Sequence, residues 1–277
     1  MSDSDGNAVG ASLSWFKRDI PYTYFEEGTS DINGYLEFSA LTNSFATWQS
    51  LTACSGGSTS DIKFTETAWR SNTDRIGYNY LDPEDNENLI IFRDDKWPLP
   101  GQIGIIGLTT TTYDTMSGQI IDADIEFNSA DFDFGINGEE DLIDLQNAAT
   151  HEIGHILGLG HSDVVGSTME AQAKFGEISK RDLECDDRDA IVFKYPADAP
   201  NGYCAYTQAP QTCGYCEPPD EIDITTSIEI IASDSDGHTG CSTTNNSFFL
   251  AVTSMLTLTL FILRRHWLKI LRVPHQD

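Results

Sequence analysis

The chain is poor in basic residues: 16 Lys and Arg stand against 44 Asp and Glu among 277 residues, giving a net charge of −28. Such a surface repels nucleic-acid phosphates and anionic lipid headgroups, so the composition excludes a nucleic-acid partner. The length allows one domain of about 200 residues with shorter segments appended to it. The acidity suits a soluble body in a salty medium or one that binds calcium, and composition does not choose between these.

Export signals are also lacking at the start of the chain. Residues 1–14 contain neither a basic stretch nor an apolar one, which predicts a flexible N-terminus and no signal peptide. The C-terminus, described below, indicates export. A shortened or misassigned start is therefore the favoured interpretation, and an unconventional export route is the alternative.

Three of the six histidines lie in one stretch, residues 151–161. His151 and His155 are four residues apart, so on an α-helix both project from one face. Two neutral imidazoles at this spacing can hold one zinc ion, with Glu152 beside them to handle protons. This spacing predicts a metal site on a helix.

His161 completes the pattern only if the chain reverses direction. It lies six residues after His155, about 240° further around a continuous helix. Gly158 and Gly160 stand where a left-handed turn costs least, so we expect the helix to end there. Three histidines leave one coordination position open, which indicates a catalytic rather than a structural zinc site.

A plainer interpretation is an amphipathic core helix that happens to carry histidines. Its apolar residues follow the i, i+3, i+4 spacing of a helix face that packs against a core. They are Leu142, Leu145, Ala149, Ile153 and Ile156. This stripe falls opposite the histidines, so the two interpretations are compatible: one face packs and the other binds.

At these residues the chain resembles the metzincin zinc endopeptidases, and among them the matrixins. Ser162 follows the third histidine, and Met169 lies eight residues after His161. The resemblance implies that Met169 forms the apolar floor of the zinc site, in a structural Met-turn. It also implies that the loop 170–180 borders the pocket for the residue after the scissile bond.

The same resemblance extends over residues 15–196 and implies an α+β fold. It predicts a twisted, mostly parallel sheet with an antiparallel edge strand, an active-site helix and a C-terminal helix. The predicted strands are 20–25, 62–65, 89–92, 105–111 and 120–127, and the predicted helices span 35–50, the motif, and 183–195. Gly107 to Thr111 would be the edge strand that pairs with an extended substrate. An ordinary edge blunted by threonines is the alternative.

Some matrixin features are absent. Glu170-Ala171 replaces the Tyr-Pro that commonly follows the methionine, and residues 1–14 lack the propeptide cysteine that would cap the zinc. The remaining histidines lie outside the predicted catalytic domain, at His238, His266 and His275. We therefore predict one zinc ion, the catalytic one, and no second structural zinc.

Acidic residues crowd the approach to the motif, and they allow two interpretations. They are Asp122, Asp124, Asp131 and Asp133. A solvated acidic face is favoured, because these residues lack the ligand spacing of a recognised calcium loop. A structural Ca²⁺ site, as in matrixins, is the alternative. Asp144 is a plausible N-cap for the motif helix.

The six cysteines indicate an oxidising compartment. Cys54 and Cys185 are the two in the predicted catalytic domain, so they are candidates for one disulfide. Residues 197–240 form a cysteine-containing segment and an acidic linker. Its three cysteines lack a nearby fourth ligand, which disfavours a zinc knuckle.

Residues 241–277 predict a membrane anchor. The sixteen residues 248–263 carry no charge, and four basic residues follow them by position 272. The positive-inside tendency places the C-terminus in the cytoplasm and the protease outside. Gly240-Cys241, the apolar segment and Arg264-Arg265 together resemble the sorting tails of myxobacterial surface proteins. The predicted location is thus the bacterial cell surface, or the medium after tail processing.

These observations predict a zinc-dependent endopeptidase that cleaves peptide bonds in extracellular proteins. Zinc held by His151, His155 and His161 would polarise a water and the scissile carbonyl, and Glu152 would carry the proton to the leaving amine. The alternative is a zinc-binding surface or adhesion module whose catalysis has lapsed. The intact Glu152 argues against it.

Overall fold

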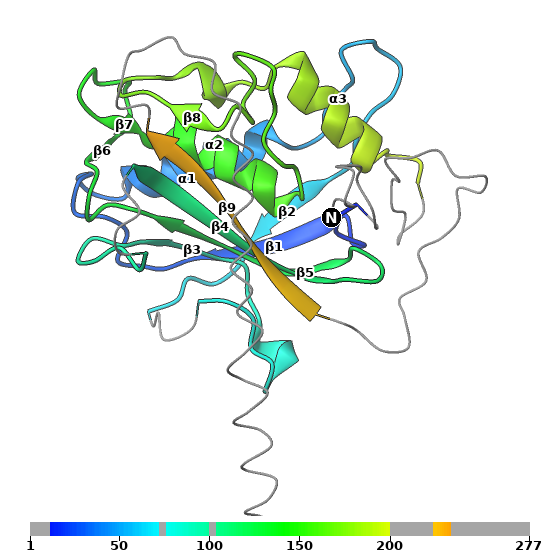
Figure 1. Cartoon of the computed structure of the whole chain (residues 1–277), viewed down its shortest axis with the longest axis horizontal. Helices are drawn as coiled ribbons and strands as arrows, with labels where there is room; N and C mark the ends of the chain where they lie inside the picture. Colours follow the sequence, from blue (N-terminus) through cyan, green and yellow to red (C-terminus); the bar gives the residue numbers. More distant parts are fainter. Residues whose placement is uncertain (1–11, 72–75, 100–103, 200–223, 234–277) are drawn as a thin grey trace, which may run out of the picture. The chain divides into compact units, whose positions relative to one another are not determined.

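The computed structural model describes residues 12–71, 76–99 and 104–199, together with the backbone of residues 224–233 (Figure 1). The central sheet has four parallel strands and an antiparallel fifth, β4. Their order is β2 (Lys63–Glu66), β1 (Asp19–Tyr24), β3 (Leu89–Phe92), β5 (Ile120–Phe127) and β4 (Ile105–Asp114). This arrangement confirms the α+β class and the mostly parallel sheet predicted from the sequence.

Two further strands extend the sheet beyond β4. β9 (Ile224–Ser233) pairs antiparallel with β4, and β8 (Gln172–Ala173) pairs parallel with β9. In Figure 1, β9 is the orange arrow between β4 and β8. Residues 224–233 were expected to belong to a linker, and no strand was predicted there. β4 would be an edge strand if the chain ended at residue 199, but β9 pairs with that edge.

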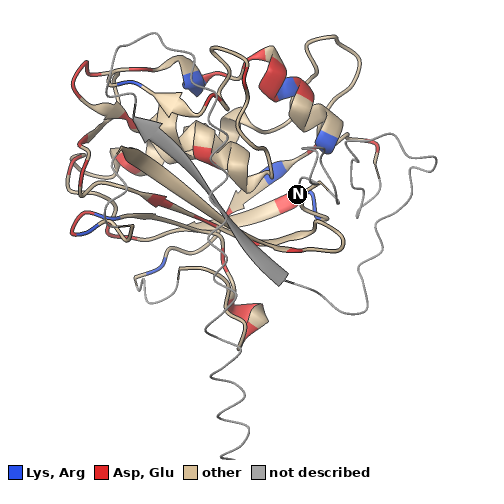
Figure 2. Ribbon diagram, viewed as in Figure 1, with Lys and Arg blue, Asp and Glu red and all other residues tan. Residues whose placement is uncertain are grey.

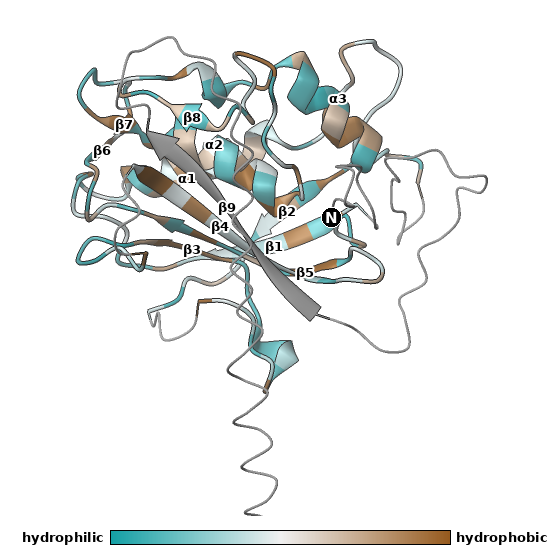
Figure 3. Ribbon diagram, in the orientation of Figure 1, coloured by the Kyte–Doolittle hydropathy of each residue, from teal (hydrophilic) through white to brown (hydrophobic). Residues whose placement is uncertain are grey.

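Two helices pack on one face of this sheet. α1 (Leu36–Thr47) and α2 (Leu145–Ile156) contact each other, and α2 also contacts β4 and β5. Their apolar residues form one core with the inward residues of the sheet, among them Ile20, Ile90 and Ile125. Figure 3 shows that β3 and the first part of β4 are the most hydrophobic strands.

Three buried aromatic residues hold α2 in place by donating hydrogen bonds to backbone carbonyl oxygens in and just after the helix. Trp48 Nε1 donates to the carbonyl oxygen of Thr150 at 2.8 Å, and Trp15 Nε1 donates to that of Ile156 at 2.8 Å. Tyr195 donates from its hydroxyl to the carbonyl oxygen of Leu157 at 2.9 Å, just past the helix. Because these groups come from three distant parts of the chain, the position of α2 depends on the whole domain.

Short elements complete the described part of the chain. They are a parallel pair, β6 (Phe134–Gly135) with β7 (Ile143–Asp144), the 3₁₀ helices η1 (Pro83–Asp85) and η2 (Ser179–Arg181), and the last helix α3 (Cys185–Lys194). In Figure 2 the acidic residues, coloured red on the ribbon, are spread over the loops and over α3. The helix α2 begins at Leu145, so Leu142 lies before it and is not part of its apolar stripe, contrary to our prediction.

Cys54 and Cys185, the candidate pair, form a disulfide. It ties the segment after α1 to the first residue of α3 across a sequence separation of 131 residues. Closing a loop of this length removes entropy from the unfolded chain, which in the chain-entropy model amounts to roughly 4–5 kcal/mol. The remaining cysteines lie outside the described residues.

The predicted membrane segment, residues 248–263, also lies outside the described residues. Over the ranges that are described, no helix combines the length and the apolar character needed to cross a bilayer.

The acidic residues of β5 do not form the solvated face that we expected. Asp122 and Asp124 are 1 % and 2 % exposed. Asp124 accepts hydrogen bonds from the backbone N–H groups of Gly77 and Leu89, so the segment that leads into β3 covers this face. Glu126 forms an ion pair with Arg93. One face of β5 is therefore apolar, and the other face is polar but buried.

Burial raises the pKa of Asp122 and of Asp124, and the charge of Asp124 raises that of Asp122 further. The folded state therefore holds protons that the unfolded chain releases near pH 4. The contribution of this pair to the free energy of unfolding is fully present below about pH 4. It is lost as the pH rises towards the folded-state pKa values.

We therefore predict that the native chain loses stability between about pH 4 and pH 7 and that the Asp122→Asn variant loses less. The difference should reach about 1.4 kcal/mol for each pH unit over which one extra proton is held. Urea unfolding at several pH values without added calcium measures it, with the exposed Asp133→Asn as the control. A native chain that gains stability with pH relative to Asp122→Asn would contradict the assignment and would favour a bound cation at the pair.

Candidate metal centre

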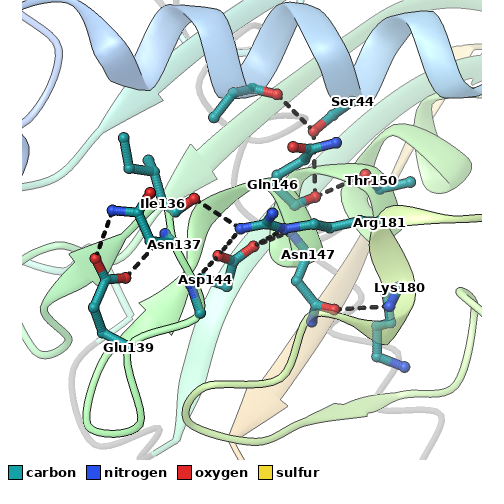
Figure 4. A network of polar contacts seen from close by, with 12 residues as sticks. Ser44, Ile136, Asn137, Glu139, Asp144, Gln146, Asn147, Thr150, Lys180 and Arg181 are labelled. Atoms are coloured by element: carbon teal, nitrogen blue, oxygen red, sulfur yellow. Dashed lines mark hydrogen bonds and ion pairs between the residues drawn. The ribbon is translucent and has the colours of Figure 1, made fainter.

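The position of the site depends on the contacts that fix the N-terminus of α2. Asp144 is its N-cap, and the Asp144 carboxylate accepts a hydrogen bond from the backbone N–H of Asn147 at 3.0 Å, as predicted. Arg181 of η2 holds that carboxylate by an ion pair and donates to the carbonyl oxygen of Ile136 at 2.8 Å (Figure 4). Asn147 Oδ1 also accepts from the backbone N–H of Lys180 at 2.8 Å. The η2 turn thus fixes the first turn of α2.

The end of α2 determines where the third histidine lies. Gly158 has φ of +76°, which glycine adopts at little cost. Its N–H donates to the carbonyl oxygen of His155 at 2.8 Å, and the N–H of Leu159 donates to that of Gly154 at 3.0 Å. These two bonds are the Schellman motif, which ends the helix and turns the chain back. Gly160 was expected to share this role, but it does not have a positive φ.

A side chain at Gly158 would also have no room. A Cβ there would lie 2.4 Å from the carbonyl oxygen of Leu13. The N-terminal segment therefore packs directly against the turn. At Gly160 nothing lies within 4 Å of such a Cβ. The turn requires glycine at one of the two positions and not at the other.

Two of the three imidazoles are oriented by backbone carbonyl groups. His151 Nδ1 lies 2.6 Å from the carbonyl oxygen of Thr168, and His155 Nδ1 lies 2.8 Å from that of Leu159. A carbonyl oxygen accepts only, so each Nδ1 carries the proton and each Nε2 presents a lone pair. These two Nε2 atoms are 3.1 Å apart. Two lone pairs at that distance repel each other unless a cation lies between them.

The donor set fits zinc. The ligand nitrogens of His151, His155 and His161 all lie within 4.8 Å of one another. Zinc binds imidazole nitrogens at about 2.0–2.1 Å in a tetrahedral site, which sets nitrogen atoms about 3.4 Å apart. Among the described residues, this trio is the group of three or more His, Cys, Asp or Glu side chains that could hold a metal. The four aspartates considered for calcium do not form a second such group.

The electrostatics of the site keep its ligands neutral. Burial lowers the pKa of His151 well below its usual value, and the neighbouring imidazoles lower it further. Burial also lowers the pKa of His155, to about 3. Metal ligation requires a neutral imidazole, with one ring nitrogen free of a proton. The two buried histidines therefore need no deprotonation at neutral pH, whereas His161 is exposed.

Glu152 lies against β4. It is fully buried, and Thr109 Oγ1 donates to Glu152 Oε2 at 2.5 Å and approaches the Glu152 carbonyl oxygen at 3.2 Å. A Cβ at Gly107 would lie only 2.6 Å from Glu152 Oε1, so the strand approaches this carboxylate closely. Thr109 and Gly107 were named in the sequence only as parts of an edge strand. Their contact with Glu152 has no signal in the sequence.

Met169 lies next to α2 at the level of the histidines. A Cβ on Gly154 would lie 2.2 Å from Met169 Sδ, so the sulfur occupies the space that glycine leaves. The turn is held by Asp187 of α3, which accepts from the backbone N–H groups of Thr168 at 2.8 Å and Met169 at 3.1 Å. Thr168 is also the residue whose carbonyl oxygen orients His151. α3 thus positions both the turn and one histidine.

Comparison with known proteins agrees with this geometry. The matrixin family matches residues 14–196, which contain the sheet β2-β1-β3-β5-β4, the three helices and the histidine trio. The chain belongs to the matrixin family.

Curated matrixin relatives match at modest identity. Metalloendoproteinase 2-MMP of Arabidopsis thaliana is 30 % identical over 201 residues, which cover 71 % of this chain and 45 % of that protein. Karilysin of Tannerella forsythia is 27 % identical over 209 residues, or 72 % of this chain and 38 % of karilysin. The chain thus spans less than half the length of these two relatives. The family implies catalytic zinc, and the histidine trio is where this matrixin would bind it.

For this matrixin we predict that Gly158→Ala weakens zinc binding at least tenfold. A residue with a Cβ at positive φ costs about 1–2 kcal/mol, and the contact with Leu13 would move the turn that carries His161. Competition with a zinc chelator measures the affinity, and Gly160→Ala is the matched control. Equal affinities in the two variants would show that the turn at Gly158 does not determine the position of His161.

Proposed function

We propose that this matrixin is a zinc-dependent endopeptidase that cleaves peptide bonds in extracellular proteins. The observation that carries the proposal is the convergence of three imidazoles at the end of the helix that also carries the buried carboxylate of Glu152. His151, His155 and His161 would hold the ion. A zinc ion bound there supplies Lewis-acid polarisation of a water and of the scissile carbonyl.

Glu152 is the proposed general base. It follows His151 on the helix, so its carboxylate lies beside the metal-binding face. In the proposed mechanism it takes a proton from the attacking water and transfers it to the nitrogen of the leaving amine. The hydrogen bond from Thr109 restricts the rotation of the carboxylate, which favours one orientation for proton transfer. Met169 would form the apolar floor under the site.

β4 is the proposed substrate strand. An extended peptide pairs with a strand edge through main-chain hydrogen bonds, which suits a protease because every peptide has the same backbone. Gly107 and Thr109 of β4 contact Glu152, so a peptide paired there would pass the catalytic carboxylate. β8 follows Met169, in the loop expected to border the pocket after the scissile bond.

The cellular setting is proposed from the sequence and the family. We place the protease domain, residues 15–196, outside the cell, in keeping with the disulfide between Cys54 and Cys185. Residues 197–240 would connect it to the membrane anchor, residues 241–277. The anchor rests on the charge-free stretch and the basic residues after it.

Hydrolysis of casein or a peptide library by the zinc-loaded full chain tests the function. We predict that Glu152→Ala lowers kcat at least a hundredfold while zinc content stays at one ion per chain, because the base is lost and the three ligands remain. Removal of zinc by a chelator should abolish activity, and re-addition should restore it. Undiminished activity in Glu152→Ala would refute the mechanism. A zinc-loaded native chain with no hydrolysis would favour the lapsed surface module.

A further inference from the structure

The outer side of β4 is occupied by the chain itself. β9 pairs with β4 in antiparallel register at nine positions, from Ile105 with Ala232 to Asp114 with Ile224. Residues 14–196 comprise the matched matrixin region, so β9 comes from sequence beyond it. The strand that pairs with the proposed substrate-binding edge is therefore a separate C-terminal segment.

β9 also passes directly beside the catalytic carboxylate. In the register, Gly107 pairs with Ile231 and Thr109 pairs with Glu229. Gly107 and Thr109 both lie close to Glu152. Directly paired residues of antiparallel strands have Cα atoms only about 4.5–5.5 Å apart. The backbone of residues 229–231 thus lies where a substrate backbone would have to lie.

The other edge of β9 is paired as well. Gln172 and Ala173 of β8 pair in parallel with Ala232 and Ser233. β8 lies in the loop that follows Met169, on the opposite side of β9 from β4. Near its C-terminal end β9 is therefore held from both sides, between the strand that contacts Glu152 and the loop beyond the Met-turn. Figure 1 shows this placement between β4 and β8, across α2.

We propose that residues 224–233 are an internal ligand of the substrate groove and compete with protein substrates. This inference rests on the proposed function, because it takes the β4 edge as the substrate-binding site. The resident segment must leave before a substrate can pair with β4.

Covalent attachment makes such competition effective even if the segment binds weakly. A tethered ligand has an effective concentration of about 1 mM at its site. A segment with a dissociation constant of about 0.1 mM would then fill the groove in roughly nine molecules of ten. Release of the segment would raise the apparent substrate affinity about tenfold. A bare β4 edge would also expose unpaired backbone groups, which favours occupation by any available strand.

The test measures peptide binding in a chain that cannot hydrolyse. The background is the zinc-loaded full chain carrying Glu152→Ala, so the measured binding does not depend on hydrolysis of the probe. Ile230→Pro with Ile231→Pro removes two adjacent N–H groups of β9, one of which must face β4 because alternate N–H groups point to opposite sides. Ile230→Val with Ile231→Val, which keeps both N–H groups, is the matched control.

The probe is a fluorescein-labelled synthetic peptide with the sequence of residues 224–233, and a scrambled peptide controls for non-specific binding. We expect the proline variant to bind the probe about ten times more tightly than the valine control by fluorescence anisotropy. Hydrogen exchange should show loss of amide protection in β4 and unchanged protection in β3 and β5. Equal affinities, or binding to neither protein, would overturn the proposal.

A second form of the experiment avoids any change within β9. A specific protease site inserted after Pro210 allows the chain to fold intact and then to be cut. Cutting removes the tether, so dilution should release the segment and raise probe affinity about tenfold. An unchanged affinity after cutting and dilution would show that β9 is a permanent structural strand. This result would overturn the proposal even if the proline variant does not fold.

Discussion

The metal site depends on the reversal of the chain at the end of α2. On a continuous helix the third histidine would point away from the first two. The Schellman bonds at Gly158 and Leu159 end the helix at Ile156, one residue after His155, and direct the chain back. The same reversal supplies the Leu159 carbonyl oxygen that orients His155. One turn therefore both brings His161 to the site and sets the tautomer of a second ligand.

The rest of the domain holds this turn and the helix in place. Trp15, Trp48 and Tyr195 donate to carbonyl oxygens between the middle of α2 and its C-cap, and Arg181 holds its N-cap. Asp187 fixes the segment whose carbonyl oxygen orients His151. Every one of these groups is distant in sequence from the histidines. The precision of the site is thus a property of the folded domain rather than of residues 151–161 alone.

Much of the fold and the composition of the site follow from the sequence, because they depend on local periodicity and spacing. The strands at 89–92 and 120–127 and the N-cap Asp144 were predicted at their observed positions. Contacts between distant segments were not predicted. Burial of Asp122 and Asp124 depends on a segment near Gly77, and the contact between Thr109 and Glu152 depends on how β4 lies beside α2. β9 was missed because its acidic, Ser/Thr-rich surroundings indicated a linker, although isoleucine and threonine are frequent in it.

The central claim is that three imidazoles form an open tripod around one zinc ion. X-ray absorption spectroscopy at the zinc edge of the purified, zinc-loaded full chain tests it most directly. The account predicts three imidazole nitrogens and at least one further oxygen at about 2.0–2.1 Å, with no sulfur. A fourth protein ligand, a sulfur contribution, or only two imidazoles in the spectrum would contradict it.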